Sequence, residues 1–196
     1  MKNSSWGIES FTKNDVHVVL LVSRVKDNTH IENFKERRTS FITDKAVEDL
    51  HEKFTDFVSH GSIGETSRMY YSINARNMEK VYKNFLHFLI DNSDFNLCSV
   101  QGKLAGIAAQ HENAATKKWM FDFDEQNDEL LEEFCKDLEA IDKTLCPEVY
   151  KTPNSHAVII SHGFDMKDFW TKWAKYDITV KKDDLLCVAW TTKNAD

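Results

Sequence analysis

The chain has 196 residues, of which 41% are hydrophobic, and its 25 Lys and Arg residues against 32 Asp and Glu residues give a formal net charge of −7 at pH 7. This composition supplies enough apolar side chains for the core of one domain, and it excludes a disordered or collagen-like chain. No apolar run reaches the roughly 18–20 residues that a membrane span needs, and residues 1–10 lack the apolar segment of a signal peptide. Residues 1–196 are therefore expected to form a single soluble domain with no membrane partner.

Cysteine usage indicates the compartment. The four cysteines, Cys98, Cys135, Cys146 and Cys187, include no C-x-x-C pair. In a chain without an export signal this pattern predicts free thiols in a reducing environment, and so a cytoplasmic location.

The negative charge is concentrated in one stretch. Residues 125–148 contain nine acidic and two basic residues, so this stretch alone accounts for the net charge of −7. The rest of the chain is neutral. Because one solvated helix face supplies the whole excess of negative charge, the net charge of the chain argues only weakly against a nucleic-acid partner.

In chain order, the first pattern is an apolar, β-branched run over 16–25, which predicts a buried strand. Apolar residues then recur at helical spacing from Ala46 to Val58, with Thr43 or Asp44 as the expected N-cap. The other expected elements are strands over 68–73, 117–124, 156–161 and 184–190, and helices over 76–90, 104–108, 127–142 and 165–175. The helix over 127–142 is expected to pack through Leu131, Phe134, Leu138 and Ile141. This alternation predicts an α+β fold with a single mixed β-sheet and helices packed against it.

The first candidate site is the pair Asp122 and Asp124 at the end of the aromatic strand WMFDFD. Side chains alternate along a strand, so both carboxylates share one face while Trp119, Phe121 and Phe123 share the other. Two adjacent carboxylates repel each other, and a hard cation such as Mg²⁺ or Mn²⁺ would relieve that repulsion. The alternative is that both acids face solvent, with Asp124 as the N-cap of the acidic helix.

A second candidate is His156, which a basic, hydroxylated turn brings to the first position of an apolar strand. Its imidazole could contact a phosphate oxygen, with help from Lys151, Thr152 and the backbone N–H groups of the turn. The alternative is a histidine at a strand edge that bonds a neighbouring carbonyl.

Two further groups could complete such a site. Asp183 or Asp184, just before the last strand, could supply a third metal ligand, although a charged turn explains this run as well. Arg68 and Arg76 flank a strand and could form a rim that faces a polyanion. Ordinary surface arginines are the alternative.

The order of these motifs resembles the archaeo-eukaryotic primase superfamily, the primase-polymerases. That family has an apolar strand ending in Asp-x-Asp, which Asp122 and Asp124 match, and a small-x-His motif, which Asn154-Ser155-His156 resembles. It also has a late acid after an apolar stretch, for which Asp177, Asp183 and Asp184 are the candidates. The likeness covers roughly residues 68–190 and suggests a small protein of phage or plasmid type, which would act in the host cytoplasm.

The resemblance implies an RNA-recognition-like sheet and two divalent ions, Mg²⁺ or Mn²⁺, on Asp122, Asp124 and the third acid. It implies a nucleotidyltransferase that uses nucleoside triphosphates and a nucleic-acid template in DNA replication. His156 would contact the triphosphate, with Lys151, Ser155, Arg76 and Arg68 as further nucleotide-binding residues. The alternative is a non-catalytic relative that binds nucleic acid or a protein, such as a replication partner.

Overall fold

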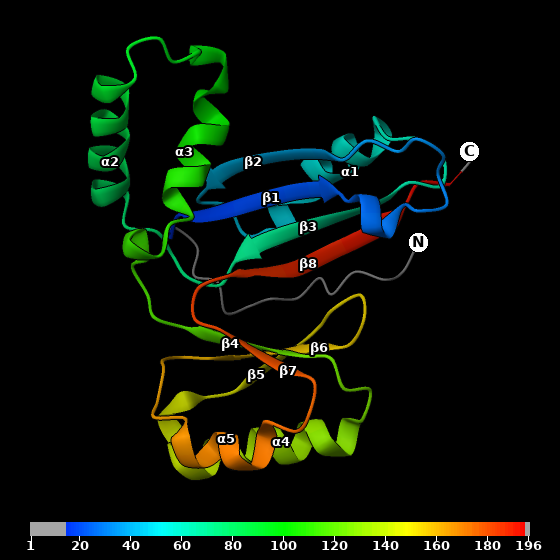
Figure 1. Cartoon of the computed structure of the whole chain (residues 1–196), viewed down its shortest axis with the longest axis vertical. Helices are drawn as coiled ribbons and strands as arrows, with labels where there is room; N and C mark the ends of the chain where they lie inside the picture. Colours follow the sequence, from blue (N-terminus) through cyan, green and yellow to red (C-terminus); the bar gives the residue numbers. More distant parts are fainter. Residues whose placement is uncertain (1–14, 195–196) are drawn as a thin grey trace. The chain divides into compact units, whose positions relative to one another are not determined.

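The computed structural model describes residues 15–194, which form two compact units (Figure 1). Unit 1 contains residues 15–115 and 185–194, and unit 2 contains Thr116–Asp184. The α+β class is confirmed, but the strands form two four-stranded antiparallel sheets in place of the single mixed sheet expected from the sequence. The expectations about residues 1–10 concern a segment outside the described residues.

The sheet of unit 1 has the strand order β2-β1-β3-β8. Its strands are β1 (His17–Ser23), β2 (Arg37–Thr43), β3 (Thr66–Ser72) and β8 (Leu185–Thr192). The central strand β1 is the apolar run seen in the sequence, and it is buried along nearly its whole length. A β-bulge interrupts the pairing of β3 with β8 between Met69 and Tyr70.

Helices cover both faces of this sheet. A 3₁₀ turn, η2 (Val47–Leu50), leads into α1 (His51–Ser59), whose Lys53 lies over the ring of Phe41 on one face. On the other face α2 (Met78–Asp91) and α3 (Val100–Ala108) form a core that includes Val18, Val81 and Ile107. The N-cap expected at Thr43 or Asp44 is wrong, because the first turn begins after Ala46.

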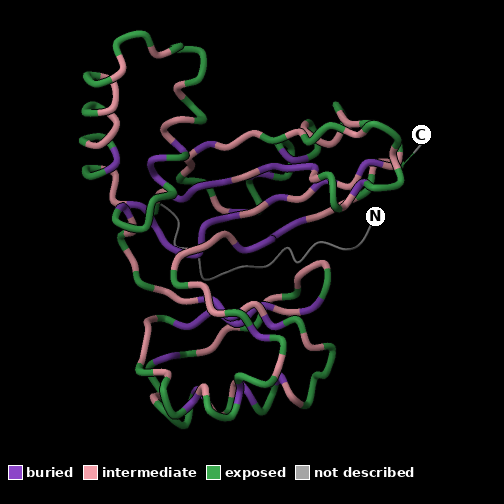
Figure 2. The backbone as a smooth tube through the Cα atoms, viewed as in Figure 1, coloured by how far each residue is buried: buried purple, intermediate pink, exposed green. Residues whose placement is uncertain are grey.

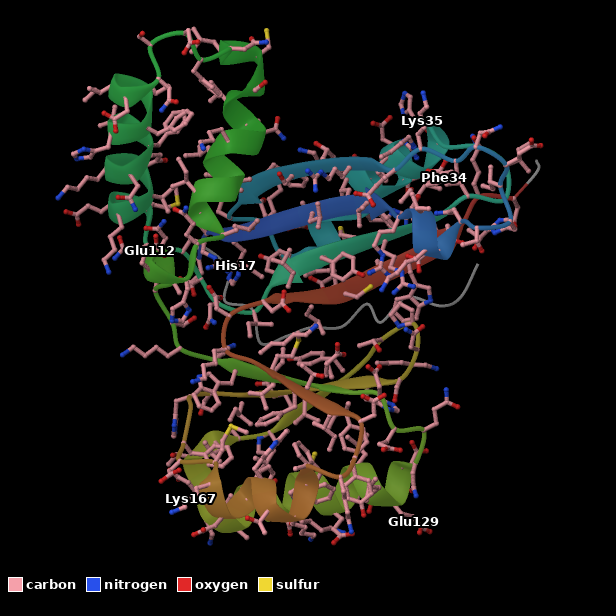
Figure 3. The ribbon with its side chains drawn as sticks, in the orientation of Figure 1. His17, Phe34, Lys35, Glu112, Glu129 and Lys167 are labelled. Atoms are coloured by element: carbon pink, nitrogen blue, oxygen red, sulfur yellow. The ribbon has the colours of Figure 1, made fainter. Side chains whose placement is uncertain are left out.

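The sheet of unit 2 has the strand order β5-β6-β4-β7. Its strands are β4 (Trp119–Phe123), β5 (Glu148–Lys151), β6 (His156–Ile160) and β7 (Ile178–Lys181). Two helices, α4 (Asp128–Ile141) and α5 (Lys167–Trp173), pack on one face. They run in opposite directions, as Glu129 near the start of α4 and Lys167 at the start of α5 show (Figure 3).

The core of unit 2 is rich in aromatic side chains. Phe134 of α4 lies at its centre, with ring centroids 5.1 Å from Phe121, 5.3 Å from Phe169 and 4.9 Å from Trp173. Leu131 and Leu138 are buried with it, as expected, but Ile141 is 46% exposed. The helix therefore packs through its first three turns, and the expected contact of Ile141 is wrong.

The remaining helical segments are short 3₁₀ turns: η1 (Val25–Asp27), η3 (Leu97–Ser99), η4 (His111–Asn113) and η5 (Lys143–Leu145). Buried residues concentrate in the strands of both sheets, whereas the outer sides of the helices are exposed (Figure 2). All four cysteines are free thiols, as expected. None of the helices formed by residues 15–194 has the length and apolar composition needed to cross a membrane.

Candidate cation and nucleotide site

Strand β4 has the alternation that its sequence predicts. Phe121 and Phe123 are fully buried against the helices, while Asp122 lies on the opposite face and is half-buried. Asp124 follows the strand, and its backbone N–H donates to the carbonyl of Asp177 at 3.0 Å. This bond extends the β4–β7 pairing by one residue, so alternation assigns Asp124 to the face of Asp122.

The N-cap of α4 is a different residue from the one considered in the sequence. The side chain of Asn127 accepts a hydrogen bond from the N–H of Leu130 at 3.1 Å. Asp124 is therefore not the cap, although it is exposed, as the alternative interpretation expected.

Lys181 brings two of the candidate acids together. Its Nζ lies 3.0 Å from Oδ2 of Asp122 and 3.3 Å from Oδ2 of Asp184. Burial lowers the pKa of Lys181, but the hydrogen bond to Asp122 and the charges of Asp184 and Asp122 outweigh it, so the pKa is raised and the ammonium form is favoured. Carboxylates from β4 and from the segment before β8 thus converge on one positive charge.

Two carboxylates are fewer ligands than a two-ion centre would need. Mg²⁺ is commonly bound by one or two carboxylates and keeps several waters or substrate oxygens as its other ligands. Asp122 and Asp184 meet that requirement. Within residues 15–194, however, no three side chains of His, Cys, Asp or Glu are grouped to hold a metal. Asp122 and Asp184 are therefore the residues that would hold a single ion with an open coordination sphere.

The turn before His156 has a defined structure. The hydroxyl of Ser155 donates to the carbonyl of Glu125 at 2.8 Å, and the N–H of Ser155 donates to Oγ1 of Thr152 at 3.2 Å. Ser155 is 8% exposed. Because its hydroxyl bonds the segment that leads into α4, Ser155 positions the turn against the start of that helix.

An open pocket of about 200 Å³ lies beside this turn. It is lined by Gln126, Asp128, Lys151, Thr152, Pro153, Asn154, Ser155 and His156. A lysine, a histidine and a threonine can all donate to an anionic oxygen, whereas Asp128 would repel one. The pocket therefore contains two of the predicted nucleotide-binding residues, Lys151 and Ser155, together with His156.

His156 and Asp122 lie on opposite faces of the sheet. Strand β6 is the neighbour of β4, as expected, and its register pairs His156 with Phe123 and Ala157 with Asp122. Directly opposite residues in an antiparallel pair project to the same side, so His156 shares the face of Phe123. Of the predicted residues of unit 2, Asp122 and Asp184 thus belong to the Lys181 cluster (Asp122, Lys181 and Asp184), and Lys151, Ser155 and His156 belong to the pocket beside the turn. Asp124 and Asp183 adjoin the cluster along the chain.

The two predicted arginines belong to unit 1, and neither is an ordinary surface residue. Nη2 of Arg68 lies 2.6 Å from Oδ1 of Asp27, whose other oxygen binds Nε of Arg24 at 2.8 Å. Arg76 is only 5% exposed, and its backbone N–H donates to the carbonyl of Val16 at 2.7 Å. Arg68 thus forms an ion pair within unit 1, and Arg76 is buried in the same unit.

Lys181 is the member of this cluster that the sequence analysis does not predict. The sequence pattern of KKDD indicates only a source of acids or a charged turn. The sequence does contain one indication of the pair with Asp184: the two residues are three positions apart, a spacing that allows an ion pair across a tight turn. The partner Asp122 lies 59 residues away, so that contact has no local signal.

Comparison with known proteins adds no relative, since no family model matches the chain and no curated protein is similar to it.

Proposed function

We propose that this protein is a metal-dependent nucleotidyltransferase of the primase-polymerase type, acting on nucleoside triphosphates and a nucleic-acid template. The observation that carries the proposal is the convergence of Asp122 and Asp184 on a single cationic group, the ammonium of Lys181. Carboxylate oxygens are ligands that Mg²⁺ and Mn²⁺ prefer, so Asp122 and Asp184 would hold such an ion when the ammonium of Lys181 is displaced. The substrates imply a cytoplasmic location, in the host if the protein is viral.

In this proposal each group has a distinct role. Asp122 and Asp184 hold the cation, and Asp124 and Asp183, their neighbours along the chain, supply further negative charge. When bound, the cation would neutralise charge on the transferring phosphates, which is the main requirement of nucleotidyl transfer. His156 and Lys151 would bind phosphate oxygens in the pocket beside the turn. Since His156 lies across the sheet from Asp122, this pocket serves a different part of the substrate from the cation.

The direct test is template-dependent incorporation of labelled nucleotides by the purified protein with Mn²⁺ or Mg²⁺. We expect incorporation by the wild type and its loss in Asp122→Asn, because the amide is a weaker cation ligand. The control is Asp56→Asn, whose carboxylate is 75% exposed and belongs to unit 1. Absence of incorporation by the wild type with every template and ion would contradict the proposal.

A second candidate function is a non-catalytic module that binds nucleic acid or a protein partner. It is favoured by Lys181, which already neutralises the two carboxylates, and by the position of His156 on the opposite face. This candidate predicts binding of single-stranded DNA or RNA that is unchanged by chelation of divalent ions, with no incorporation. Fluorescence anisotropy with labelled oligonucleotides, with and without EDTA, measures that outcome.

A further inference from the structure

One face of the unit 1 sheet carries arginine and aromatic side chains in register. Arg38 of β2 lies opposite Val22 of β1, and Val22 also pairs with Arg68 of β3. Arg68 in turn lies opposite Trp190 of β8. Directly opposite residues in antiparallel strands project to the same side, so these four residues form one row across the sheet. Tyr70, two residues after Arg68 on β3, lies on the same face in the next row.

This part of the face is partly open to solvent. In Figure 1, α2 and α3 lie at one end of the sheet, where they form a core that includes Val18 and Ile42. Toward the other end Arg38 is exposed, and Tyr70 and Trp190 are partly exposed. The two rings and the arginine therefore lie on a surface that a ligand can reach.

The charge of this face is positive. The four strands of the sheet contain three arginines and no acidic residue, and two of these arginines, Arg38 and Arg68, lie on this face. Arg24 follows β1 directly. Its Nε lies 2.8 Å from one carboxylate oxygen of Asp27, and Nη2 of Arg68 lies 2.6 Å from the other. Three guanidinium groups against one carboxylate leave an excess of two positive charges.

Aromatic rings beside arginines provide the chemistry that binds single-stranded nucleic acid. Bases stack on aromatic rings, while arginines bind phosphate oxygens or stack on the bases themselves. The guanidinium of Arg24 already lies 5.8 Å from the centroid of the Tyr70 ring, so charge and ring occupy the same place. A duplex keeps the faces of its bases inside the double helix, and this surface therefore favours a single strand.

We propose that this face of the unit 1 sheet binds single-stranded nucleic acid. Trp190 and Tyr70 stack on bases, and Arg38 and Arg24 bind the phosphates between them. The row from Arg38 to Trp190 crosses four strands spaced about 4.8 Å apart, a length of about 14 Å that suits two or three nucleotides. The inference rests on the proposed function for the class of partner, and it names the surface of unit 1 that holds the strand.

Fluorescence anisotropy tests the proposal with labelled oligothymidylate and oligouridylate, in EDTA and without nucleoside triphosphates. We expect the wild type to bind at least one of these strands more tightly than duplex DNA. Arg38→Gln should weaken binding by about threefold or more and reduce the slope of log Kd against log salt by about 0.7, because one phosphate contact is lost. The matched control is Lys53→Gln, which removes an exposed charge from the opposite face and should change neither quantity. No binding by the wild type, equal affinity for duplex DNA, or equal effects of the two variants would overturn the proposal.

Trp190→Leu tests the stacking contact. It keeps an apolar side chain and removes the ring, so we expect binding to weaken by about fivefold or more with an unchanged salt slope. The control is Tyr82→Ala, which removes a tyrosine that is 53% exposed on α2. Ultraviolet crosslinking of the wild type, followed by mass spectrometry of peptides, gives a result that needs no variant to fold. Adducts in the peptides of Tyr70 or Trp190 support the proposal, and adducts confined to unit 2 contradict it.

These results are separable from the proposed nucleotidyl transfer. Binding at this face by a protein that incorporates no nucleotide would contradict the transfer and leave the present inference standing. Incorporation by a protein whose Arg38→Gln and Trp190→Leu variants bind the strand as tightly as the wild type would overturn the present inference alone.

Discussion

At the scale of single residues, the side chain of Lys181 controls the charge of the candidate cation site. Its ammonium satisfies Asp122 and Asp184, so a divalent cation that binds the same oxygens must displace it. The three side chains are 30–40% exposed, which leaves room for the lysine stem to move into solvent. Lys181 would therefore compete with the cation for its ligands.

Replacing this lysine is expected to increase metal affinity. Lys181→Met keeps the length of the stem and removes the competing charge, so we expect Mn²⁺ to bind about tenfold more tightly, the equivalent of about 1.4 kcal/mol. Titration of free Mn²⁺ followed by electron paramagnetic resonance measures this change. Lys182→Met is the control, since its ammonium lies 4.9 Å from the ring of Trp119. An equal increase in Mn²⁺ affinity in the two variants would mean that the affinity depends on the net charge of the protein and not on the contact of Lys181 with the two carboxylates.

Glu65 illustrates a different residue-scale effect, in which a carboxylate supports the fold of unit 1. It is 2% exposed, and its oxygens accept hydrogen bonds from Nε of Arg37 at 2.9 Å and from the N–H of Ser62 at 2.8 Å. Burial raises the pKa of Glu65, but these hydrogen bonds and the charge of Arg37 outweigh it and lower the pKa below its ordinary value of 4.5. The ionised form is therefore favoured in the folded protein.

This lowered pKa sets a pH dependence. The stability that Glu65 contributes is fully present above its ordinary pKa and is lost as the pH falls through the lower pKa of the folded state. We expect Glu65→Gln to reduce the free energy of unfolding by about 2 kcal/mol at pH 7 and by much less at about pH 3. Urea unfolding at both pH values measures the difference. Glu32→Gln, an exposed position, should change little at either pH, and a pH-independent effect of Glu65→Gln would contradict the assignment.

At the scale of elements, the joint between β6 and α5 depends on a glycine. A Cβ atom at Gly163 would lie 2.1 Å from Cζ2 of Trp119, whose ring packs next to Phe164 with centroids 6.2 Å apart. The tryptophan begins β4, so the contact joins that strand to the segment before α5. A side chain larger than hydrogen would force the indole ring from its place in unit 2.

Gly163→Ala is therefore expected to destabilise the protein by about 2 kcal/mol, because overpacking forces the ring or the backbone to move. The opposite sign is expected for Gly106→Ala, which lies within α3 with no atom within 4 Å of the new Cβ. That change should stabilise the helix by about 0.5–1 kcal/mol. Chemical denaturation of the three proteins tests both signs, and a neutral Gly163→Ala would show that Trp119 can be displaced at no cost.

At the scale of the whole molecule, each unit contains one exposed and one shielded thiol. Cys98 of unit 1 and Cys146 of unit 2 are exposed. Burial raises the pKa of Cys187 in unit 1 to about 12 and, in unit 2, burial and the charge of Glu139 raise the pKa of Cys135 to about 11. The thiolate is the reactive form, so the shielded thiols report the integrity of their units.

We expect a thiol reagent to modify Cys98 and Cys146 rapidly at about pH 8, while Cys135 and Cys187 react only when their units open. Mass spectrometry of peptides after timed labelling identifies the modified sites. In increasing urea, Cys135 reports unit 2 and Cys187 reports unit 1. Rapid modification of either shielded thiol in the native protein would contradict the burial that the structure assigns to it.

Much of the fold could be predicted from local patterns. The strands β1, β3, β4, β6 and β8 and the helices α2 and α4 have the apolar periodicity of their type, so their positions agree with the sequence analysis within a few residues. Strand β2 was missed because RRTSFIT is mostly polar and half-buried. Strands β5 and β7 were missed because each has only four residues and pairs with a single neighbour at the edge of its sheet.

The sequence by itself determined the α+β class, the buried aromatic face of β4 and the acidic outer face of α4, because each depends on side-chain periodicity within one element. Tertiary structure alone decided that the strands divide into two sheets and that Lys181 joins Asp122 to Asp184. It also decided that His156 lies across the sheet from Asp122, since the register of β6 against β4 fixes the face of every side chain. These outcomes depend on contacts between segments far apart in the chain, and the free energy of such contacts is not reflected in the local sequence pattern of either segment.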